Sequence, residues 1–392
     1  MKVKVLDSIL SSFLPHQYFF NQNELGHRNE VVSTIFERIG IDIEFVSENN
    51  VDDFNEVIYP IVNLNNLTVD NQNIFSDILQ KYIKKGLKVF IFHLNECFLE
   101  SEVFSFNEYC LNNNIDTSKI YLFVNNNKIK KYLSDMKSKI NFYFPFYQSI
   151  EHSNLLQTNF IEPSDDDRNF LFMCHNNKMV SHRLATIVLL KENNILKDVD
   201  YSCVDFSVSH DNDGLLKRIE TEYKTFTDSY NSIIQNGSKL SFYENEKFTF
   251  DEIDSPIINV TTFKNSYVNI VTETDFSEDV IHITEKSLKP FYYYQLPIFV
   301  APHNHLSELR KIYGFDMFDD IIDHSYDSEE DPLIRMKLIF KQLELIKNNP
   351  DVIKDFYVMF KDRFINNNKI VCEIINKKND LEIGRASCRE RV

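Results

Sequence analysis

Apolar runs of strand length alternate with segments of helical periodicity along most of the chain. In the first half, the runs at residues 41–46, 58–62, 88–92 and 120–124 are rich in β-branched and aromatic residues, as buried strands are. Residues 31–36 and 74–82 have the period of amphipathic helices. Strands that alternate with helices are typical of βαβ units with a parallel sheet, so we predict an α/β fold.

The same pattern restarts after a polar, irregular segment at residues 162–168, which we interpret as a domain boundary. Further strands are predicted at 170–174, 257–260, 268–271, 280–283 and 297–300, and helices at 181–190, 306–312 and 332–375. We therefore predict one α/β domain at residues 1–165, a second at 166–340 and C-terminal helices at 341–381. Residues 382–392 differ abruptly in composition and resemble a translated vector sequence, so they are excluded from the fold.

Composition and charge narrow the classes of function. Hydrophobic residues make up 43% of the 392 residues, which is enough for each half to bury a core. The net charge of −17 and the lack of a long basic block disfavour nucleic-acid binding as the main role. Six scattered cysteines without a C-x-x-C pair argue against a zinc site or a disulfide framework. With no signal peptide and no apolar run near the length of a membrane span, we expect a cytoplasmic protein.

Ligands in open α/β sheets bind outside the carboxyl ends of the strands, so polar residues just past a strand are candidates for chemistry. Thr284, Glu285 and Lys286 follow one predicted strand. Pro290 places the helix start near Glu285 or Lys286, because a proline is tolerated only in the first turn. A lysine at a helix N-terminus is explained by an anion bound there. An ordinary helix with Thr284 as its cap and Lys286 in solvent explains the spacing equally well.

A second junction of the same form follows the strand at 170–174. Asn176 lies in its polar turn, and Ser181 begins the next helix. The residues there that can reach a phosphate are Lys178, His182 and Arg183. A solvated turn with Ser181 as an ordinary N-cap is the alternative.

Carboxylates lie at two other strand ends. Glu96 follows the strongest strand of the first half and could act as a general base, although an ordinary first helical turn also explains it. Glu273 follows the strand at 268–271 and precedes the Thr-Glu-Lys triplet. His303 and His305 could bind a metal, but a role in capping the helix at 306–312 explains them better. The chain has no glycine-rich phosphate loop.

The stretch from Val280 to Tyr326 resembles the C-terminal signature of two-domain GT-B glycosyltransferases, most of all the α-1,3-fucosyltransferase-like kind and its phage and bacterial relatives. The motifs are Ile-Thr-Glu-Lys at 283–286, Lys-Pro at 289–290, Leu-Pro-Ile at 296–298, Leu-Arg at 309–310, Gly-Phe-Asp-Met-Phe at 314–318 and Asp-His-Ser-Tyr-Asp at 323–327. Residues 169–190, with Asn176 and Arg183, resemble the start of the nucleotide-binding domain of the same enzymes.

The resemblance implies roles for these residues. Glu285 would accept hydrogen bonds from the ribose of a nucleotide sugar, and Lys286 and Arg183 would neutralise the departing diphosphate in place of a metal ion. Asn176 and Thr284 would complete the donor site. The resemblance also implies an inverting mechanism, with a carboxylate of the first, acceptor-side domain as the base, for which we choose Glu96.

One departure from the family pattern concerns the donor. The family has a Phe-Glu-Asn stretch where this chain has Val-Thr-Glu-Thr at 271–274. We expect Glu273 to take that catalytic place, and the change leaves both the sugar and the base of the donor open, with a GDP-linked sugar as one candidate.

These expectations describe two Rossmann-like domains that face each other across a cleft. The predicted activity is metal-independent transfer of a sugar from a nucleotide diphosphate sugar to a hydroxyl acceptor such as a glycan, without a cofactor, a nucleic-acid partner or a membrane span. A non-catalytic interaction module that retains the fold is the main alternative. Transfer to modified DNA bases is a third possibility, which the net charge of −17 opposes.

Overall fold

The computed structural model describes part of the chain in detail. The described residues are 2–6, 42–46, 57–58, 83–84, 89–93, 100–124, 132, 134–135, 139–143, 168–178, 180–205, 214–222, 225, 228–229, 231, 233, 263–276, 281 and 283–376. The chain divides into two compact units, Met1–Tyr147 with Lys377–Val392, and Gln148–Asn376. Each unit is described by itself.

The first unit contains two small parallel sheets. One has the order β2 (Asp42–Val46), β1 (Lys2–Leu6), β3 (Val57–Ile58), and the other has the order β4 (Val89–His93), β5 (Ile120–Val124), β6 (Asn141–Tyr143). Helix α4 (Glu100–Asn112) and the short helix η2 (Thr117–Lys119) connect β4 to β5. Val103, Phe106 and Cys110 are buried on one side of α4, at the spacing of an amphipathic helix that covers a sheet.

The second unit is built on one four-stranded parallel sheet. The strands are β7 (Phe170–Lys178), β8 (Val199–Asp205), β9 (Ser266–Thr272) and β10 (Leu296–Val300), in the spatial order β10-β9-β7-β8. The chain runs from β7 outward to β8, then returns to the other side of β7 for β9 and β10. The order therefore reverses between β7 and β9. In sheets of this kind the crevice beside such a reversal, at the carboxyl ends of the strands, is where ligands bind.

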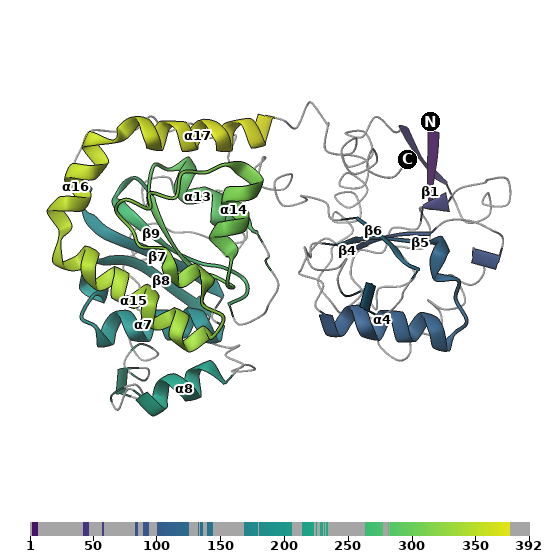
Figure 1. Cartoon of the computed structure of the whole chain (residues 1–392), viewed down its shortest axis with the longest axis horizontal. Helices are drawn as coiled ribbons and strands as arrows, with labels where there is room; N and C mark the ends of the chain where they lie inside the picture. Colours follow the sequence, from purple (N-terminus) through teal and green to yellow (C-terminus); the bar gives the residue numbers. More distant parts are fainter. Residues whose placement is uncertain are drawn as a thin grey trace. The chain divides into compact units, whose positions relative to one another are not determined.

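Helices cover both faces of this sheet. Helix α7 (Ser181–Glu192) connects β7 to β8, and α13 (Glu285–Tyr292) connects β9 to β10 in the opposite direction. Right-handed crossovers in opposite directions lie on opposite faces, which is the arrangement in Figure 1. The other helices among the described residues of this unit are η3 (Leu196–Asp198), α8 (Leu215–Glu222), α14 (His305–Tyr313), η5 (Ser325–Ser328), α15 (Pro332–Asn348), α16 (Pro350–Met359) and α17 (Lys361–Asn376).

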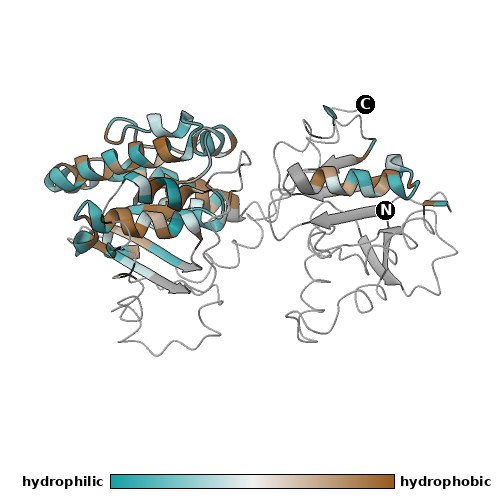
Figure 2. Cartoon of the chain, turned by 90° about the horizontal axis from the view of Figure 1, so that it is seen from below, coloured by the Kyte–Doolittle hydropathy of each residue, from teal (hydrophilic) through white to brown (hydrophobic). Residues whose placement is uncertain are grey.

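The last three helices pack on the sheet of the second unit. Helix α15 contacts β10 and α8, α16 contacts β9, and α17 contacts α13. They therefore run from one face of the sheet, past the start of β9, to the other face (Figure 1). Figure 2 shows hydrophobic and hydrophilic residues together on these helices, as expected for helices with one side on a sheet and the other in water.

Burial in the second unit follows from this layering. Strands β9 and β10 are buried at every position, as expected for parallel strands covered on both faces. Pro297 lies within β10, where its missing N–H is tolerated because β10 is an edge strand.

A buried glutamine ties the start of β10 to its neighbours. Gln295 is fully buried, and its Nε2 donates hydrogen bonds to the carbonyls of Phe263 at 3.1 Å and Ser266 at 3.2 Å. Its Oε1 accepts a hydrogen bond from Asn269 Nδ2, on β9, at 2.8 Å. The Nε2 group also donates to Met173 Sδ, on β7, at 3.0 Å, so the Gln295 amide ties the start of β10 to both β9 and β7.

The structure confirms much of the predicted element pattern and corrects part of it. The α/β class, the parallel sheets and the C-terminal helices are confirmed. The strand predicted at 280–283 is wrong, since the described residues Ile281 and Ile283 lie in no strand. Asn176 lies inside β7 and not in a turn, and the N-cap of α7 is Val180 and not Ser181. The elements predicted at 31–36, 74–82 and 257–260 and the tail at 382–392 lie outside the described residues.

Candidate functional site

A fully buried carboxylate occupies the carboxyl end of β9. Glu273 follows Thr272 directly, and its side chain is 0% exposed. Its Oε2 accepts a hydrogen bond from Thr284 Oγ1 at 2.6 Å, and its Oε1 accepts one from Ser287 Oγ. The Lys286 ammonium lies 3.9 Å from Oε2. A buried charge needs such partners, and because all three belong to the start of α13, Glu273 holds that helix against the end of β9.

Helix α13 begins at Glu285, with Thr284 as its N-cap. Thr284 Oγ1 accepts a hydrogen bond from the backbone N–H of Lys286 at 3.2 Å while it donates to the buried carboxylate. The Lys286 ammonium donates to Thr274 Oγ1 at 3.1 Å, and 28% of its side chain is exposed. Glu285 pairs with Lys289 at 3.4 Å, one turn further along the helix. Lys286 therefore turns back toward the end of β9 and remains accessible to a ligand.

The start of α7 is bound to the same segment from the β7 side. His182 Nε2 donates a hydrogen bond to the backbone carbonyl of Glu273 at 2.8 Å, and the Arg183 guanidinium donates to that carbonyl at 3.1 Å. The nitrogen of His182 must carry the proton here, because a carbonyl can only accept. Asn176, near the end of β7, accepts a hydrogen bond from Thr272 through its Oδ1. Side chains from β7, α7 and α13 thus converge on the end of β9.

Charges in this cluster perturb one another. Burial would raise the pKa of Glu273, but Lys286, His305 and the hydrogen bonds from the two hydroxyls outweigh it and hold the pKa below its ordinary value. Burial lowers the pKa of Lys286, opposed by the charge of Glu273. Burial also lowers the pKa of Arg183, opposed by Glu273 and Glu285. A guanidinium keeps its proton at neutral pH, so the cluster contains a permanent buried cation.

The neighbouring histidine is neutral at pH 7. Burial and, next in size, the positive charge of Arg183 lower the pKa of His182 to about 4. Its ring stacks on Phe276, with centroids 5.7 Å apart and planes 23° apart. His182 therefore acts here as a neutral donor that fixes the segment after β9.

A serine and a second histidine complete the surroundings of Glu273. Ser287 Oγ lies 2.8 Å from His305 Nε2, and the same nitrogen lies 3.9 Å from Glu273 Oε1. A serine, a histidine and a carboxylate in contact are the parts of a nucleophilic site. All three are 0% exposed, so no substrate can reach the hydroxyl. They instead join the first turn of α13 to the first residue of α14.

The arrangement is suited to bind an anion at the start of α13. The helix N-terminus has N–H groups without intrahelical partners and the positive end of the dipole. Lys286 adds an accessible ammonium beside it, and Arg183 adds a buried positive charge from α7. A phosphate or diphosphate group placed there would meet both cations and the helix end.

The structure brings together six of the seven residues predicted from sequence. Asn176 and Glu273 lie at the carboxyl ends of β7 and β9, Arg183 lies in the first turn of α7, and Thr284, Glu285 and Lys286 form the N-cap and first turn of α13. Glu96 and Lys178's side chain lie outside the described residues. The helix starts at Glu285 as predicted, although Pro290 lies in its second turn and not its first. Lys286 does not simply project into solvent, as the ordinary capped-helix explanation required.

Sequence analysis missed two members of the cluster, Ser287 and His305. We had expected His305 to cap α14, but the carboxylate of Asp327 accepts the hydrogen bonds from the N–H groups of Leu306 at 2.9 Å and Ser307 at 3.0 Å. No local pattern marks His305, since its partners lie 18 and 32 positions earlier in the chain. The buried pair Ser287 and Glu273 could be connected to it only through the fold.

Among the described residues, no group of three or more His, Cys, Asp or Glu side chains is arranged to hold a metal ion. No helix among them is both long enough and apolar enough to cross a membrane.

Comparisons with known proteins return similar folds and no assigned family. No family model matches the chain, and no curated protein matches it significantly. The DNA-modifying enzyme β-glucosyltransferase is 11% identical over 97% of both chains, with a TM-score of 0.43. The β-glucosyltransferase of T4 phage with its UDP-glucose substrate is 12% identical over 97% of this chain and 100% of that one, with a TM-score of 0.41. A trehalose-6-phosphate synthase is 9% identical over 96% of this chain and 80% of that one, with a TM-score of 0.42. TM-scores below 0.5 are too low to assign a function, so the function has to be argued from the site.

Proposed function

We propose that the protein is a glycosyltransferase of the GT-B type, which transfers a sugar from a nucleotide diphosphate sugar to a hydroxyl acceptor. One observation carries the proposal. Arg183, Lys286 and the N-terminus of α13 converge at the carboxyl ends of β7 and β9, where the strand order of a parallel sheet reverses. That crevice is where such sheets bind nucleotides, and the two cations suit a diphosphate.

The two cations would have different tasks. Lys286 is partly exposed and would contact the diphosphate directly. Arg183 is buried, and its guanidinium donates to the Glu273 carbonyl, so it would supply charge from behind and fix the segment after β9. Negative charge develops on the diphosphate as the sugar leaves, and cations held in place stabilise that transition state. This is the chemistry that a metal ion supplies in other enzymes, and we propose that the transfer is metal-independent.

The carboxylates would also differ in role. Glu285 is about a quarter exposed, beside Lys286, and would accept hydrogen bonds from the ribose hydroxyls of the donor. Glu273 has no exposed surface and both of its oxygens accept hydrogen bonds, which supports a positioning role more than a catalytic one. The catalytic role predicted for Glu273 and the role of Glu96 as the base of an inverting reaction stay predictions.

A calorimetric titration of UDP, GDP, ADP and CMP in the presence of EDTA tests the donor site. We expect one nucleotide diphosphate to bind at micromolar concentration, and Lys286→Met to weaken that binding by about tenfold or more, because a charge-assisted hydrogen bond is lost. Lys311→Met is the matched control, since Lys311 is 74% exposed and pairs with Glu308 on α14. Absence of binding by all four nucleotides, or equal binding by both variants, would contradict the proposal.

The alternative is a non-catalytic interaction module that retains the fold. A transfer assay separates the two, with the sugar donors of whichever base binds and with glycans and hydroxymethylated DNA as acceptors. Sugar transfer or slow donor hydrolysis, reduced in Lys286→Met, supports an enzyme. Tight nucleotide binding without turnover of any donor would favour the module.

A further inference from the structure

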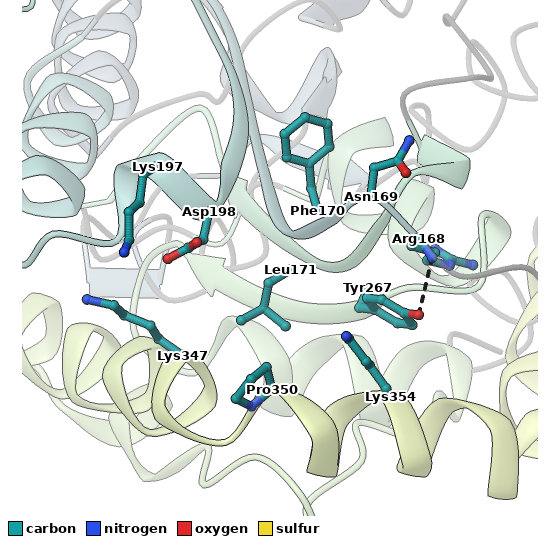
Figure 3. Close-up of a pocket in the computed structure, with 10 residues that line it drawn as sticks. All are labelled: Arg168, Asn169, Phe170, Leu171, Lys197, Asp198, Tyr267, Lys347, Pro350 and Lys354. Atoms are coloured by element: carbon teal, nitrogen blue, oxygen red, sulfur yellow. Dashed lines mark hydrogen bonds between the residues drawn. The ribbon is translucent and has the colours of Figure 1, made fainter.

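A pocket lies at the amino ends of β7 and β9, at the opposite ends of these strands from the candidate functional site. Its volume is about 300 Å³, and we call it the amino-edge pocket. It is lined by Arg168, Asn169, Phe170, Leu171, Lys197, Asp198, Tyr267, Lys347, Pro350 and Lys354 (Figure 3). Strand β7 runs from Phe170 at this pocket to Asn176 at the donor cluster, six residues further on. At about 3.3 Å per residue the two places are roughly 20 Å apart, so one small ligand cannot occupy both.

The amino-edge pocket is basic in an acidic protein. Four of its lining side chains are cationic, and Asp198 is the single carboxylate among the described residues that line it. The whole chain, by contrast, has a net charge of −17. The cations come from separate elements, with Lys197 on η3, Lys347 near the end of α15 and Lys354 on α16. Such a convergence raises the local concentration of anions.

One end of the pocket carries two cationic side chains, Arg168 and Lys354, whose charge suits a compact anion. Arg168 donates to the carbonyls of Phe263 and Ser266 and to Tyr357 Oη, which are all neutral groups. Among the described residues, no carboxylate lies within ion-pair distance of the Arg168 guanidinium. Figure 3 shows the Lys354 side chain rising beside Tyr267 at this end. Among the described residues, Lys354 pairs with Asp351 at 4.0 Å, and the Asp351 side chain is 90% exposed.

The wall between the two ends is the start of a helix. Helix α16 begins at Pro350, which lines the pocket, and its N-cap Asn349 makes no side-chain capping hydrogen bond. Its first-turn N–H groups and dipole add to the positive potential that the lysines create.

The other end of the pocket offers hydrogen-bonding groups of both kinds. Figure 3 shows Lys197 and Lys347 at the same end of the pocket as Asp198. Lys347 also donates to the carbonyl of Asn193 at 3.1 Å, which holds its ammonium in place. The Asp198 carboxylate can accept hydrogen bonds from hydroxyls, while the two lysines at this end can donate to hydroxyl oxygens.

We propose that the amino-edge pocket binds a small phosphorylated compound with several hydroxyl groups. Its phosphate lies against Arg168, Lys354 and the start of α16, and its hydroxyls lie against Asp198 and Lys347. The bounded volume and the acidic chain favour a small molecule over a nucleic-acid backbone, which needs an extended basic surface. The site is separate from the proposed donor site and does not depend on the proposed activity.

Isothermal titration with ribose 5-phosphate, inorganic phosphate and ribose tests this proposal on the full chain. We expect ribose 5-phosphate to bind at least tenfold more tightly than either fragment, with Lys354→Ala and Lys347→Ala each weakening it about tenfold. Lys341→Ala, on α15 but not lining the pocket, is the matched control and should bind like the wild type. Thermal unfolding of each variant confirms that it is folded.

Unchanged binding of ribose 5-phosphate in the Lys347→Ala/Lys354→Ala double variant would overturn the proposal. Absence of ribose 5-phosphate binding at millimolar concentration would also overturn it. Equal binding of inorganic phosphate would overturn the part that assigns hydroxyl recognition to Asp198. A saturating amount of whichever nucleotide binds the donor site should not displace ribose 5-phosphate, because the two places are roughly 20 Å apart, and displacement would overturn the proposal of a separate site. Tighter binding of an oligothymidylate than of ribose 5-phosphate would show a nucleic-acid surface instead.

Discussion

Replacing Glu273 with glutamine tests whether the buried carboxylate organises the candidate site. Glu273→Gln keeps the shape of the side chain and removes its charge. The Thr284 and Ser287 hydroxyls then bond to a neutral amide, and the Lys286 ammonium, 3.9 Å away, loses its counter-ion. We therefore expect the second unit to be less stable and the first turn of α13 to be less firmly held.

The magnitude follows from the contacts. A hydrogen bond to a charged group contributes about 1 kcal/mol more than a neutral one, and two such bonds are weakened. The lost ion pair adds a similar amount, since the Lys286 side chain is only 28% exposed. Relief of the desolvation of the carboxylate offsets part of this, which leaves a net loss of about 2 kcal/mol. In a unit of roughly 150–250 residues that lowers Tm by about 4–8 °C.

Differential scanning calorimetry measures this shift, because the chain has no tryptophan to report it by fluorescence. Glu285→Gln is the matched control. Its carboxylate pairs with Lys289 at a partly exposed position, so its loss should cost less than about 0.5 kcal/mol and 2 °C. Equal shifts of under 2 °C in both variants would refute the reasoning that Glu273 organises the site.

The difference between wild type and Glu273→Gln should also depend on pH. The folded pKa of Glu273 lies below its ordinary value, so the unfolded state takes up the proton first as the pH falls. The stability from the carboxylate is then present above about pH 4.3 and lost as the pH falls through the folded pKa. The two melting curves should converge at low pH, and a constant difference down to pH 3 would contradict this assignment of charge.

Three further predictions concern the surroundings of the site. His182 has a folded pKa of about 4, against 6.5 when unfolded, so the wild type should lose about 2 kcal/mol of its free energy of unfolding between pH 7 and pH 5. In a pH series of calorimetric scans, His182→Phe should lack this pH dependence of stability. Arg335 is buried and donates hydrogen bonds to three backbone carbonyls, including that of Phe276. Arg335→Met should therefore lower Tm by about 4–8 °C and weaken nucleotide binding. Unchanged nucleotide binding would argue against a link between Arg335 and the candidate site. Gly314 ends α14 at φ 76° with open space at its Cβ, so Gly314→Ala should cost only strain, about 1 kcal/mol in urea unfolding, and a neutral result would refute it.

The sequence predicted elements well where pattern and tertiary context agree. The strand predicted at 120–124 is β5, and α13 begins at Glu285, one of the two positions near which its start is predicted. The apolar side chains of α13 at the spacing i, i+3, i+4 are also buried, with Leu288 at 2%, Phe291 at 1% and Tyr292 at 4% exposed. These are positions where local propensity and burial favour the same structure.

Where the local sequence pattern and the tertiary context favour different structures, the prediction from sequence is wrong. His175, Asn176 and Asn177 have low strand propensity, yet β7 continues through them because it pairs with β8 in register, Asn176 opposite Cys203. The run at 280–283 has the β-branched composition of a strand, but its described residues Ile281 and Ile283 lie in no strand. Their side chains pack in the interior instead. Side-chain composition alone does not show whether a neighbouring strand is available for pairing.

The buried amide of Gln295 bears on how this sheet assembles. In the native register Leu296 faces Val268 and Pro297 faces Asn269, and the side chain of Gln295 meets Asn269 and the carbonyls of Phe263 and Ser266. Sliding β10 by one residue would turn every side chain of the strand to the other face and leave this amide unpaired in the interior. Strand β10 is an apolar edge strand, so hydrophobic burial alone would distinguish poorly between registers that differ by a shift along β9. The hydrogen bonds of Gln295 therefore stabilise the native register of β10 over the shifted ones.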